Sequence, residues 1–154
     1  MNNTIHSSDD FEGMRKAGNL AASTLDLLVE KVKPGISTEE LDRIAFEYIT
    51  SHGGLIAPLF YKGYPKSICT SVNHVVCHGI PSDDKVLKDG DIINIDVTLI
   101  KDGFHGDTSK TFIVGKGSVR AERLVETSRH CLNLGIAAVR PGATLGDIGY
   151  AIQR

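Results

Sequence analysis

Residues 92–112 read IINIDVTLIKDGFHGDTSKTF, two alternating apolar runs on either side of Asp102-Gly103. An Asp-Gly pair is strongly favoured in two-residue hairpin loops, because both residues of a type I′ turn adopt positive φ. The pattern therefore predicts an antiparallel hairpin. Its register pairs Lys101 with Phe104, Thr98 with Asp107, and Asp96 with Ser109.

This register gives the hairpin one apolar and one polar face, because successive side chains of a strand alternate. Asp96 and Asp107 become diagonal neighbours, with β-carbons roughly 7 Å apart. Two carboxylates at that spacing can bind a close pair of ions, and oxygen donors with imidazole suit Mn, Fe, Co or Zn. The spacing alone also allows a polar face that is simply solvated. The predicted polar face comprises Asn94, Asp96, Thr98, Asp107 and Ser109.

Two amphipathic helices are predicted before the hairpin. The first spans about residues 9–31, with Ser8 as its N-cap, and ends at Pro34-Gly35. The second spans about residues 37–51 and opens with a capping box between Ser37 and Glu40.

The rest of the chain predicts an α+β fold. Apolar runs bounded by turn residues predict strands, and a third amphipathic helix follows them. The order α-α-β-β-β-β-α lacks the strand-helix alternation of a Rossmann sheet. The predicted strands span about residues 55–60, 67–72, 91–100 and 104–114, and the third helix about 118–140.

A short motif occurs twice, as VKPGIS at residues 32–37 and as VRPGAT at residues 139–144, an offset of 107 positions. Both copies end a long predicted helix and open another through Ser or Thr. This pattern is typical of an internal duplication, although Pro-Gly after a helix is common by chance. A true duplication predicts that the chain stops inside its second unit.

Composition and charge exclude several classes of protein. The 17 basic and 19 acidic residues are scattered and give a net charge of −2, which argues against a nucleic-acid-binding or anionic-membrane-binding surface. No apolar run is long enough to span a bilayer. The three cysteines, Cys69, Cys77 and Cys131, form no CxxC motif, and the polar start shows no signal peptide. We therefore predict a cytoplasmic protein with reduced thiols.

Several other side chains have both a structural and a functional interpretation. His78 is flanked by apolar residues and a turn, so it is either a structural histidine or an imidazole donor beside a reacting carbonyl. Tyr61 and Tyr64 wall a pocket or cover a core edge, and Cys69 fits either setting. His105 shares the polar face if the register holds, and we assign it no role.

Four blocks of sequence, in the right order, resemble the bacterial type I methionine aminopeptidases. The similarity extends from about Phe11 to the last residue. The blocks are YKGYPKSIC at 61–69, VVCHGIP at 75–81, LKDGDIINIDV at 87–97 and KDGFHGDTSK at 101–110.

The resemblance implies the pita-bread (creatinase/aminopeptidase) fold, in which two pseudo-symmetric αβ halves surround a dinuclear metal centre. We therefore expect residues 1–154 to form a single metallopeptidase domain that is incomplete at its C-terminal end. In this interpretation residues 1–7 are a flexible lead, 8–116 the first half, and 117–154 the opening helices of the second half.

The resemblance also implies roles for individual residues. Two divalent ions (Co, Mn, Fe or Zn) would be held in part by Asp96 and Asp107, with Asp107 as the bridging ligand. His78 would be catalytic and contact the substrate. The methionine side-chain pocket would include Tyr61, Tyr64 and Cys69, and the backbone carbonyls of Asn73 and Val75 would hold Na or K.

The implied function is removal of the initiator methionine from nascent polypeptide N-termini, near the ribosome, by a monomer when complete. The family takes one further histidine and two glutamates from its second half, whereas the only acids after Asp107 are Glu122, Glu126 and Asp147. We therefore expect the chain alone to be weakly active or inactive. The alternatives are an Xaa-Pro or dipeptide pita-bread peptidase and a non-catalytic pita-bread peptide-binding module.

Overall fold

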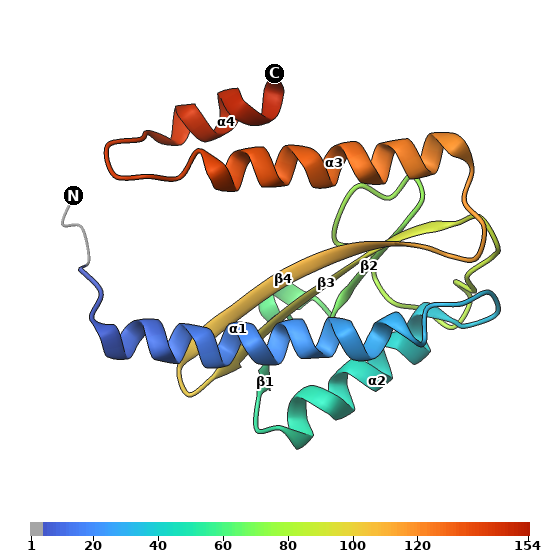
Figure 1. The fold of residues 1–154 in the computed structure, drawn as a ribbon. Helices are drawn as coiled ribbons and strands as arrows, with labels where there is room; N and C mark the ends of the chain where they lie inside the picture. Colours follow the sequence, from blue (N-terminus) through green and yellow to red (C-terminus); the bar gives the residue numbers. More distant parts are fainter. Residues whose placement is uncertain (1–4) are drawn as a thin grey trace. The chain divides into compact units, whose positions relative to one another are not determined.

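The computed structural model describes residues 5–154, and the chain divides into two compact units, Met1–Lys116 and Gly117–Arg154. The first unit contains two helices and a four-stranded antiparallel sheet, and the second contains a pair of helices (Figure 1). The α+β prediction is confirmed. Of the predicted lead over residues 1–7, residues 1–4 lie outside the described residues.

Helix α1 (Ser8–Val29) begins one residue earlier than predicted, because Ser7 rather than Ser8 is its N-cap. The Ser7 hydroxyl accepts from the Asp10 amide at 3.3 Å, and the Asp10 carboxylate accepts from the Ser7 amide at 2.7 Å. A cap at Ser8 would have placed Phe11 at the third helical position, where no side-chain acceptor exists. The complete capping box therefore decides between the two serines.

Helix α2 (Thr38–Ser51) has the predicted cap, since the Ser37 hydroxyl accepts from the Glu40 amide at 3.1 Å. The other half of the predicted box is absent. The Glu40 carboxylate instead accepts from the guanidinium of Arg43, one turn along the helix. A charged partner at this spacing competes with the backbone N–H of the cap.

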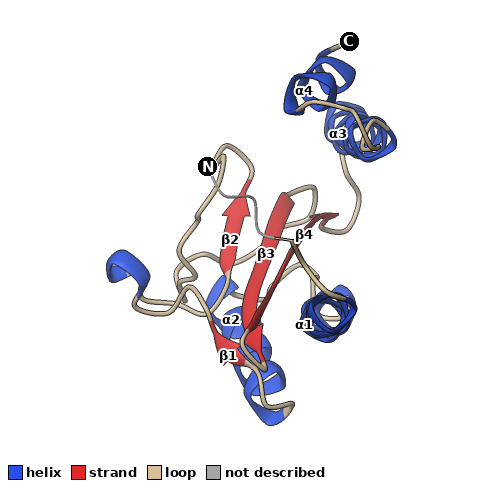
Figure 2. Ribbon diagram, turned by 90° about the vertical axis from the view of Figure 1, so that its left-hand side faces the viewer, coloured by secondary structure: helices blue, strands red, loops and turns tan. Residues whose placement is uncertain are grey.

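Strand β3 (Ile92–Lys101) is the centre of the sheet. Strand β4 (Phe104–Ile113) pairs with its whole length on one side, and β1 (Leu55–Ile56) and β2 (Cys69–Val72) pair with its two ends on the other (Figure 2). The predicted hairpin register is confirmed at every named pair, and Asp102 (φ 51°) and Gly103 (φ 84°) both have the positive φ of the predicted turn.

The core lies between the helices and the apolar face of β3. Helix α1 packs against β3 and β4, and α2 packs against α1 and β1 (Figure 2). Gly106 of β4 makes the closest approach, because a β-carbon there would lie 2.2 Å from the Ala17 carbonyl oxygen of α1. The alternate side chains of β3 that form the core, all fully buried, are Ile93, Ile95, Val97 and Leu99.

The second unit consists of α3 (Val119–Ala137), capped by Ser118, and α4 (Leu145–Gln153), capped by Thr144. The turn between them repeats the turn between α1 and α2, since Gly35 and Gly142 have φ of 93° and 87°. Each glycine precedes a Ser or Thr cap by two residues. This agreement in backbone conformation favours duplication over a chance similarity of two six-residue motifs, in which Val, Pro and Gly are identical.

No helix among residues 5–154 is both long and apolar enough to cross a membrane.

Candidate functional site

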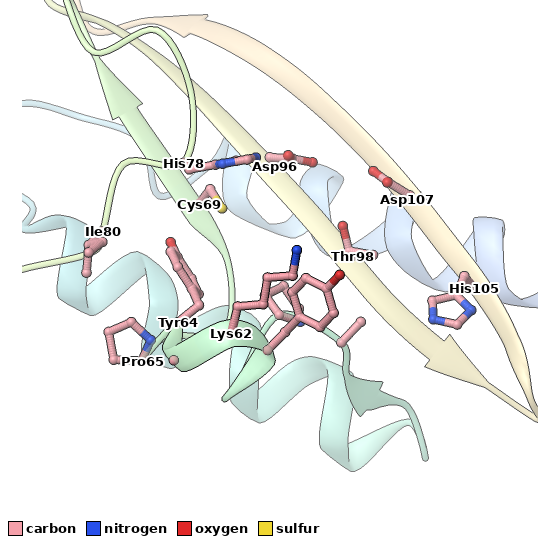
Figure 3. A pocket seen from close by; sticks show the side chains of 14 residues that line it. Lys62, Tyr64, Pro65, Cys69, His78, Ile80, Asp96, Thr98, His105 and Asp107 are labelled. Atoms are coloured by element: carbon pink, nitrogen blue, oxygen red, sulfur yellow. The ribbon is translucent and has the colours of Figure 1, made fainter.

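The polar face of the β3–β4 hairpin carries the two predicted metal ligands. Asp96 pairs with Cys69 on one side and Ser109 on the other, and Asp107 pairs with Thr98. Their carboxylates are on the same face and point toward each other in Figure 3. The hairpin register alone creates this juxtaposition.

The electrostatics of Asp96 show that the charges are close. Burial raises the pKa of Asp96, and the negative charge of Asp107 raises it further, whereas His78 lowers it. Burial is the larger cause of this shift, and the repulsion between the two carboxylates adds to it; a bound cation would relieve the repulsion.

A cavity of about 840 Å³ opens on this face. The structure brings together all six side chains that the sequence suggested for the metal site and the pocket, from three separate segments of the chain (Figure 3). These six cavity-lining residues are Tyr61, Tyr64, Cys69, His78, Asp96 and Asp107.

His78 reaches the cavity through an unusual backbone conformation. Its φ is 53°, in the left-handed region that non-glycine residues seldom adopt. The next residue, Gly79, lies directly against β2, because its carbonyl accepts from the Thr70 amide at 2.8 Å and its amide donates to the Ser71 hydroxyl at 3.2 Å. A β-carbon on Gly79 would lie 2.2 Å from the Thr70 carbonyl oxygen, so any other residue would push this loop away from β2.

The segment that carries the two tyrosines is a tight loop around the 3-10 turn Tyr61–Gly63. Phe60 (φ 67°) and Lys62 (φ 48°) both have positive φ, and the Phe60 amide donates to the Tyr64 carbonyl at 2.7 Å. Tyr61 is 67% exposed, whereas Tyr64 is half-buried. The two rings therefore face the cavity from different depths.

Cys69 is buried at the base of the cavity. Burial raises the pKa of its thiol, against the lowering effect of the nearby Tyr64 hydroxyl, so the thiol is neutral at physiological pH. A neutral thiol behaves as a small apolar group, which suits the wall of a pocket. All three cysteines are free.

Asp42 of α2 positions this wall, and the sequence analysis missed it. One carboxylate oxygen accepts from the amides of Ser67 (2.8 Å) and Ile68 (2.9 Å), and the residue is only 7% exposed. These bonds occupy the backbone where a strand was predicted, which explains why β2 begins at Cys69 rather than at residue 67. A single aspartate in an amphipathic helix has no local pattern that reveals such a long-range contact.

Asn73 and Val75, suggested for a monovalent cation, do not line the cavity. Asn73 (φ 55°) binds the Asp91 carboxylate and the Ile92 amide through its side chain. The backbone carbonyls of Asn73 and Val75 accept no hydrogen bond from any residue of the described part of the chain.

His105 received no role from the sequence. It lines the cavity together with Thr98, which was predicted on the polar face, and with Lys62 and Ile80 (Figure 3).

The donor set fits a divalent metal in part. Two converging carboxylates provide hard oxygen ligands, yet residues 5–154 contain no group of three or more His, Cys, Asp or Glu that could hold an ion. The site as it stands therefore offers two anchoring carboxylates and leaves further coordination positions to water or other ligands.

Comparisons with known proteins agree with this geometry. Residues 12–154 match the model of metallopeptidase family M24. The chain is 56% identical over 149 residues to a methionine aminopeptidase of Rickettsia prowazekii, covering 97% of this chain and 57% of that protein. It is likewise 56% identical over 152 residues to the methionine aminopeptidase of Escherichia coli K12, covering 98% of this chain and 58% of that one. The chain thus spans less than three-fifths of the relatives it matches.

Solved structures give the same result. The crystal structure of the Rickettsia prowazekii methionine aminopeptidase superposes with a TM-score of 0.95 over 97% of this chain and 60% of that one, at 56% identity. The Thermotoga maritima methionine aminopeptidase superposes with a TM-score of 0.94 over the same shares at 34% identity. An Xaa-Pro dipeptidase of Bacillus anthracis superposes with a TM-score of 0.83 over 97% of this chain and 40% of the dipeptidase chain. At 17% identity it shows a shared fold alone. The predicted pita-bread fold is confirmed, and the chain belongs to metallopeptidase family M24.

Proposed function

We propose that this chain provides two metal-binding carboxylates, a substrate-contacting imidazole and a methionine pocket for a methionine aminopeptidase that acts on nascent polypeptide N-termini. The observation that carries the proposal is the meeting of Asp96, Asp107 and His78 at one cavity. The 56% identity to proteins named methionine aminopeptidase supports this activity over the others of the family.

In this proposal Asp96 and Asp107 hold two divalent ions, drawn from Co, Mn, Fe or Zn. When bound, such ions lower the pKa of water and polarise the scissile carbonyl. The carboxylates of the hairpin fix where that chemistry takes place, because both are carried by a regular two-stranded ladder.

His78 donates a hydrogen bond to the peptide next to the methionine and orients its carbonyl. Tyr61, Tyr64 and the neutral Cys69 thiol pack around the unbranched thioether, which an apolar pocket selects by fit. Lys62 lines the same cavity and places a positive charge near the peptide.

Three further assignments belong to the same proposal. The carbonyls of Asn73 and Val75, which accept no hydrogen bond from the described residues, hold a Na or K ion. The protein acts near the ribosome in the cytoplasm, where its free thiols remain reduced. The complete enzyme is a monomer.

The ligand count predicts how the chain behaves by itself. Two carboxylates leave most coordination positions of two ions to water, so bound metal exchanges readily and its geometry is loose. We expect the chain with added Mn or Co to release methionine from a Met-Ala-Ser peptide very slowly. Robust turnover that disappears in Asp107→Ala would show that two carboxylates suffice.

A chimera tests the activity directly. This chain, joined to the part of the Rickettsia prowazekii enzyme that it does not match, should release methionine from Met-Ala-Ser and spare Val-Ala-Ser. Asp96→Ala and Asp107→Ala should each abolish turnover. A folded chimera that binds Mn but cleaves neither peptide would contradict the proposal and favour the peptide-binding module.

A further inference from the structure

The two tyrosines of the cavity make different contacts. The Tyr64 hydroxyl lies 2.9 Å from the Ile68 carbonyl oxygen and 3.1 Å from the Gly79 carbonyl oxygen, and its proton is shared between them. The Tyr61 hydroxyl makes no hydrogen bond with any described residue, and its side chain is mostly exposed. Both rings line the cavity, but among the described residues only the Tyr64 hydroxyl has a hydrogen-bond partner. Figure 3 shows Tyr64 at the cavity.

The Gly79 carbonyl is the point through which the His78 loop is fixed. It accepts from the Thr70 amide as well as from Tyr64, so two donors saturate it. The Gly79 amide is bound separately by the Ser71 hydroxyl. Three bonds thus hold one residue, and the imidazole of His78 is attached to the residue immediately before it.

His78 needs such a restraint. A non-glycine residue in the left-handed region is intrinsically unfavourable, and it persists only where the surroundings impose it. His78 is itself exposed, so no packing around its side chain imposes its φ of 53°. The bonds to Gly79 are therefore the restraint that the structure offers.

We propose that Tyr64 is a positioning residue, whose hydroxyl holds the Gly79 carbonyl and thereby fixes His78 beside Asp96 and Asp107, whereas Tyr61 contributes only a wall. The relevance of this positioning to methionine release rests on the proposed function. The burial that raises the pKa of Tyr64 keeps its hydroxyl protonated, and therefore a donor, throughout the physiological range.

The test compares Tyr64→Phe with Tyr61→Phe in the 154-residue chain, since both variants lose one hydroxyl from the same cavity. The Thr70 amide, which donates to Gly79, should exchange with solvent roughly fivefold faster in Tyr64→Phe and at the wild-type rate in Tyr61→Phe. The NMR order parameter of the His78 amide should fall from about 0.85 toward 0.6 in the first variant only. Ser71→Ala, which removes a second bond to Gly79, should loosen His78 in the same way.

A third readout follows the substrate without requiring turnover. The His78 imidazole resonance should shift when a Met-Ala-Ser peptide is added to wild type or Tyr61→Phe, and should shift less in Tyr64→Phe. Unchanged Thr70 exchange and His78 order in Tyr64→Phe, with core amides of α1 such as Leu25 as the check on folding, would overturn the positioning role. If the His78 imidazole resonance of wild type does not shift when the peptide is added, only the proposed function is contradicted. The positioning role is tested separately, because the exchange measurement does not involve substrate.

Discussion

The β3–β4 hairpin and the segment from Phe60 to Ile80 line the same cavity, but different forces place them. The hairpin needs only its own sequence, since Asp102 and Gly103 form the turn and the ladder then fixes both aspartates. The segment is held by bonds from outside it, including those from Asp42. The groups proposed to bind metal are therefore on a locally specified scaffold, and those proposed to contact substrate are on one that tertiary contacts define.

The backbone conformations show the same difference. The hairpin uses positive φ at Asp102 and Gly103, where the turn type requires it. The segment uses positive φ at four non-glycine residues, which costs about 1–2 kcal/mol at each of them except Asn73, because asparagine tolerates this region. Contacts elsewhere must offset that cost. The four residues are Phe60, Lys62, Asn73 and His78.

The largest effect is expected where the hairpin meets α1. A β-carbon on Gly106 would lie 2.2 Å from the Ala17 carbonyl oxygen, and both belong to regular elements that cannot move separately. Gly106→Ala should therefore lower the free energy of unfolding by about 3 kcal/mol, measured by urea denaturation.

Gly18→Ala is the matched control for that variant. Gly18 lies in α1, one residue after Ala17, and a β-carbon on Gly18 would meet nothing within 4 Å. We expect it to raise stability by up to about 1 kcal/mol through helix propensity. Equal losses in the two variants would contradict the steric argument.

The second effect is expected at Asp42, on which the start of β2 depends. Asp42→Ala removes the acceptor of two buried backbone amides and should cost about 2 kcal/mol, measured by urea denaturation. Burial raises the pKa of Asp42 above its ordinary 3.8, although the bonds from Ile68 and Ser67 lower it.

The sign of the pH dependence at Asp42 follows from that shift. The folded chain binds the proton more tightly than the unfolded chain, so this group adds stability as pH falls from neutral through the raised pKa toward 3.8. The difference in unfolding free energy between wild type and Asp42→Ala should therefore widen over that window. Urea titrations at pH 7 and pH 4 measure it, and a narrowing difference would refute the assignment.

The contrast between local and tertiary contacts also determines how much of the structure could be predicted from the sequence. The hairpin register, the polar face and the Ser37 cap follow from turn chemistry and alternation, which are properties of neighbouring residues. The Ser7 cap was missed by one position because two adjacent serines differ only in what stands three residues later. Helix α3 ends at Ala137, three residues before its predicted end.

The position of His78 could not be derived from its neighbours in sequence. Tyr64, Thr70 and Ser71 all bind the adjacent Gly79, and none of them is a neighbour of His78 in the sequence. The resemblance to a known family supplied what the spacing lacked. Asp42 was missed by both routes, because its role is a contact and not a motif.

The third effect, at Gly79, is small in the free energy of unfolding and large in the local protection of one amide. A β-carbon on Gly79 would approach the Thr70 carbonyl oxygen as closely as one on Gly106 approaches Ala17. Gly79 lies in a loop, however, which can move away. Gly79→Ala should cost only about 1 kcal/mol by urea denaturation, while the Thr70 amide loses its protection from exchange. A loss as large as that of Gly106→Ala would show that the segment is as rigid as the hairpin.

The smallest effect is a gain in stability. It tests whether holding Asp96 and Asp107 close together destabilises the metal-free hairpin. Asp107 contributes to the raised pKa of Asp96, so the two charges repel each other in the metal-free chain. Asp107→Asn removes that repulsion and should raise the free energy of unfolding by a few tenths of a kcal/mol at pH 7 and low salt, because exposed pairs interact weakly. Added salt should reduce the gain by screening. Asp102→Asn makes the same charge change at a turn position where asparagine is equally acceptable, and should have almost no effect on stability.

Added Mn should make wild type more stable than Asp107→Asn. An ion that binds the folded wild type stabilises it by mass action, and it finds one ligand fewer in Asp107→Asn. If Asp107→Asn is less stable than wild type without metal, the Asp107 carboxylate stabilises the metal-free fold. It would then be wrong that the hairpin holds two repelling carboxylates for a cation.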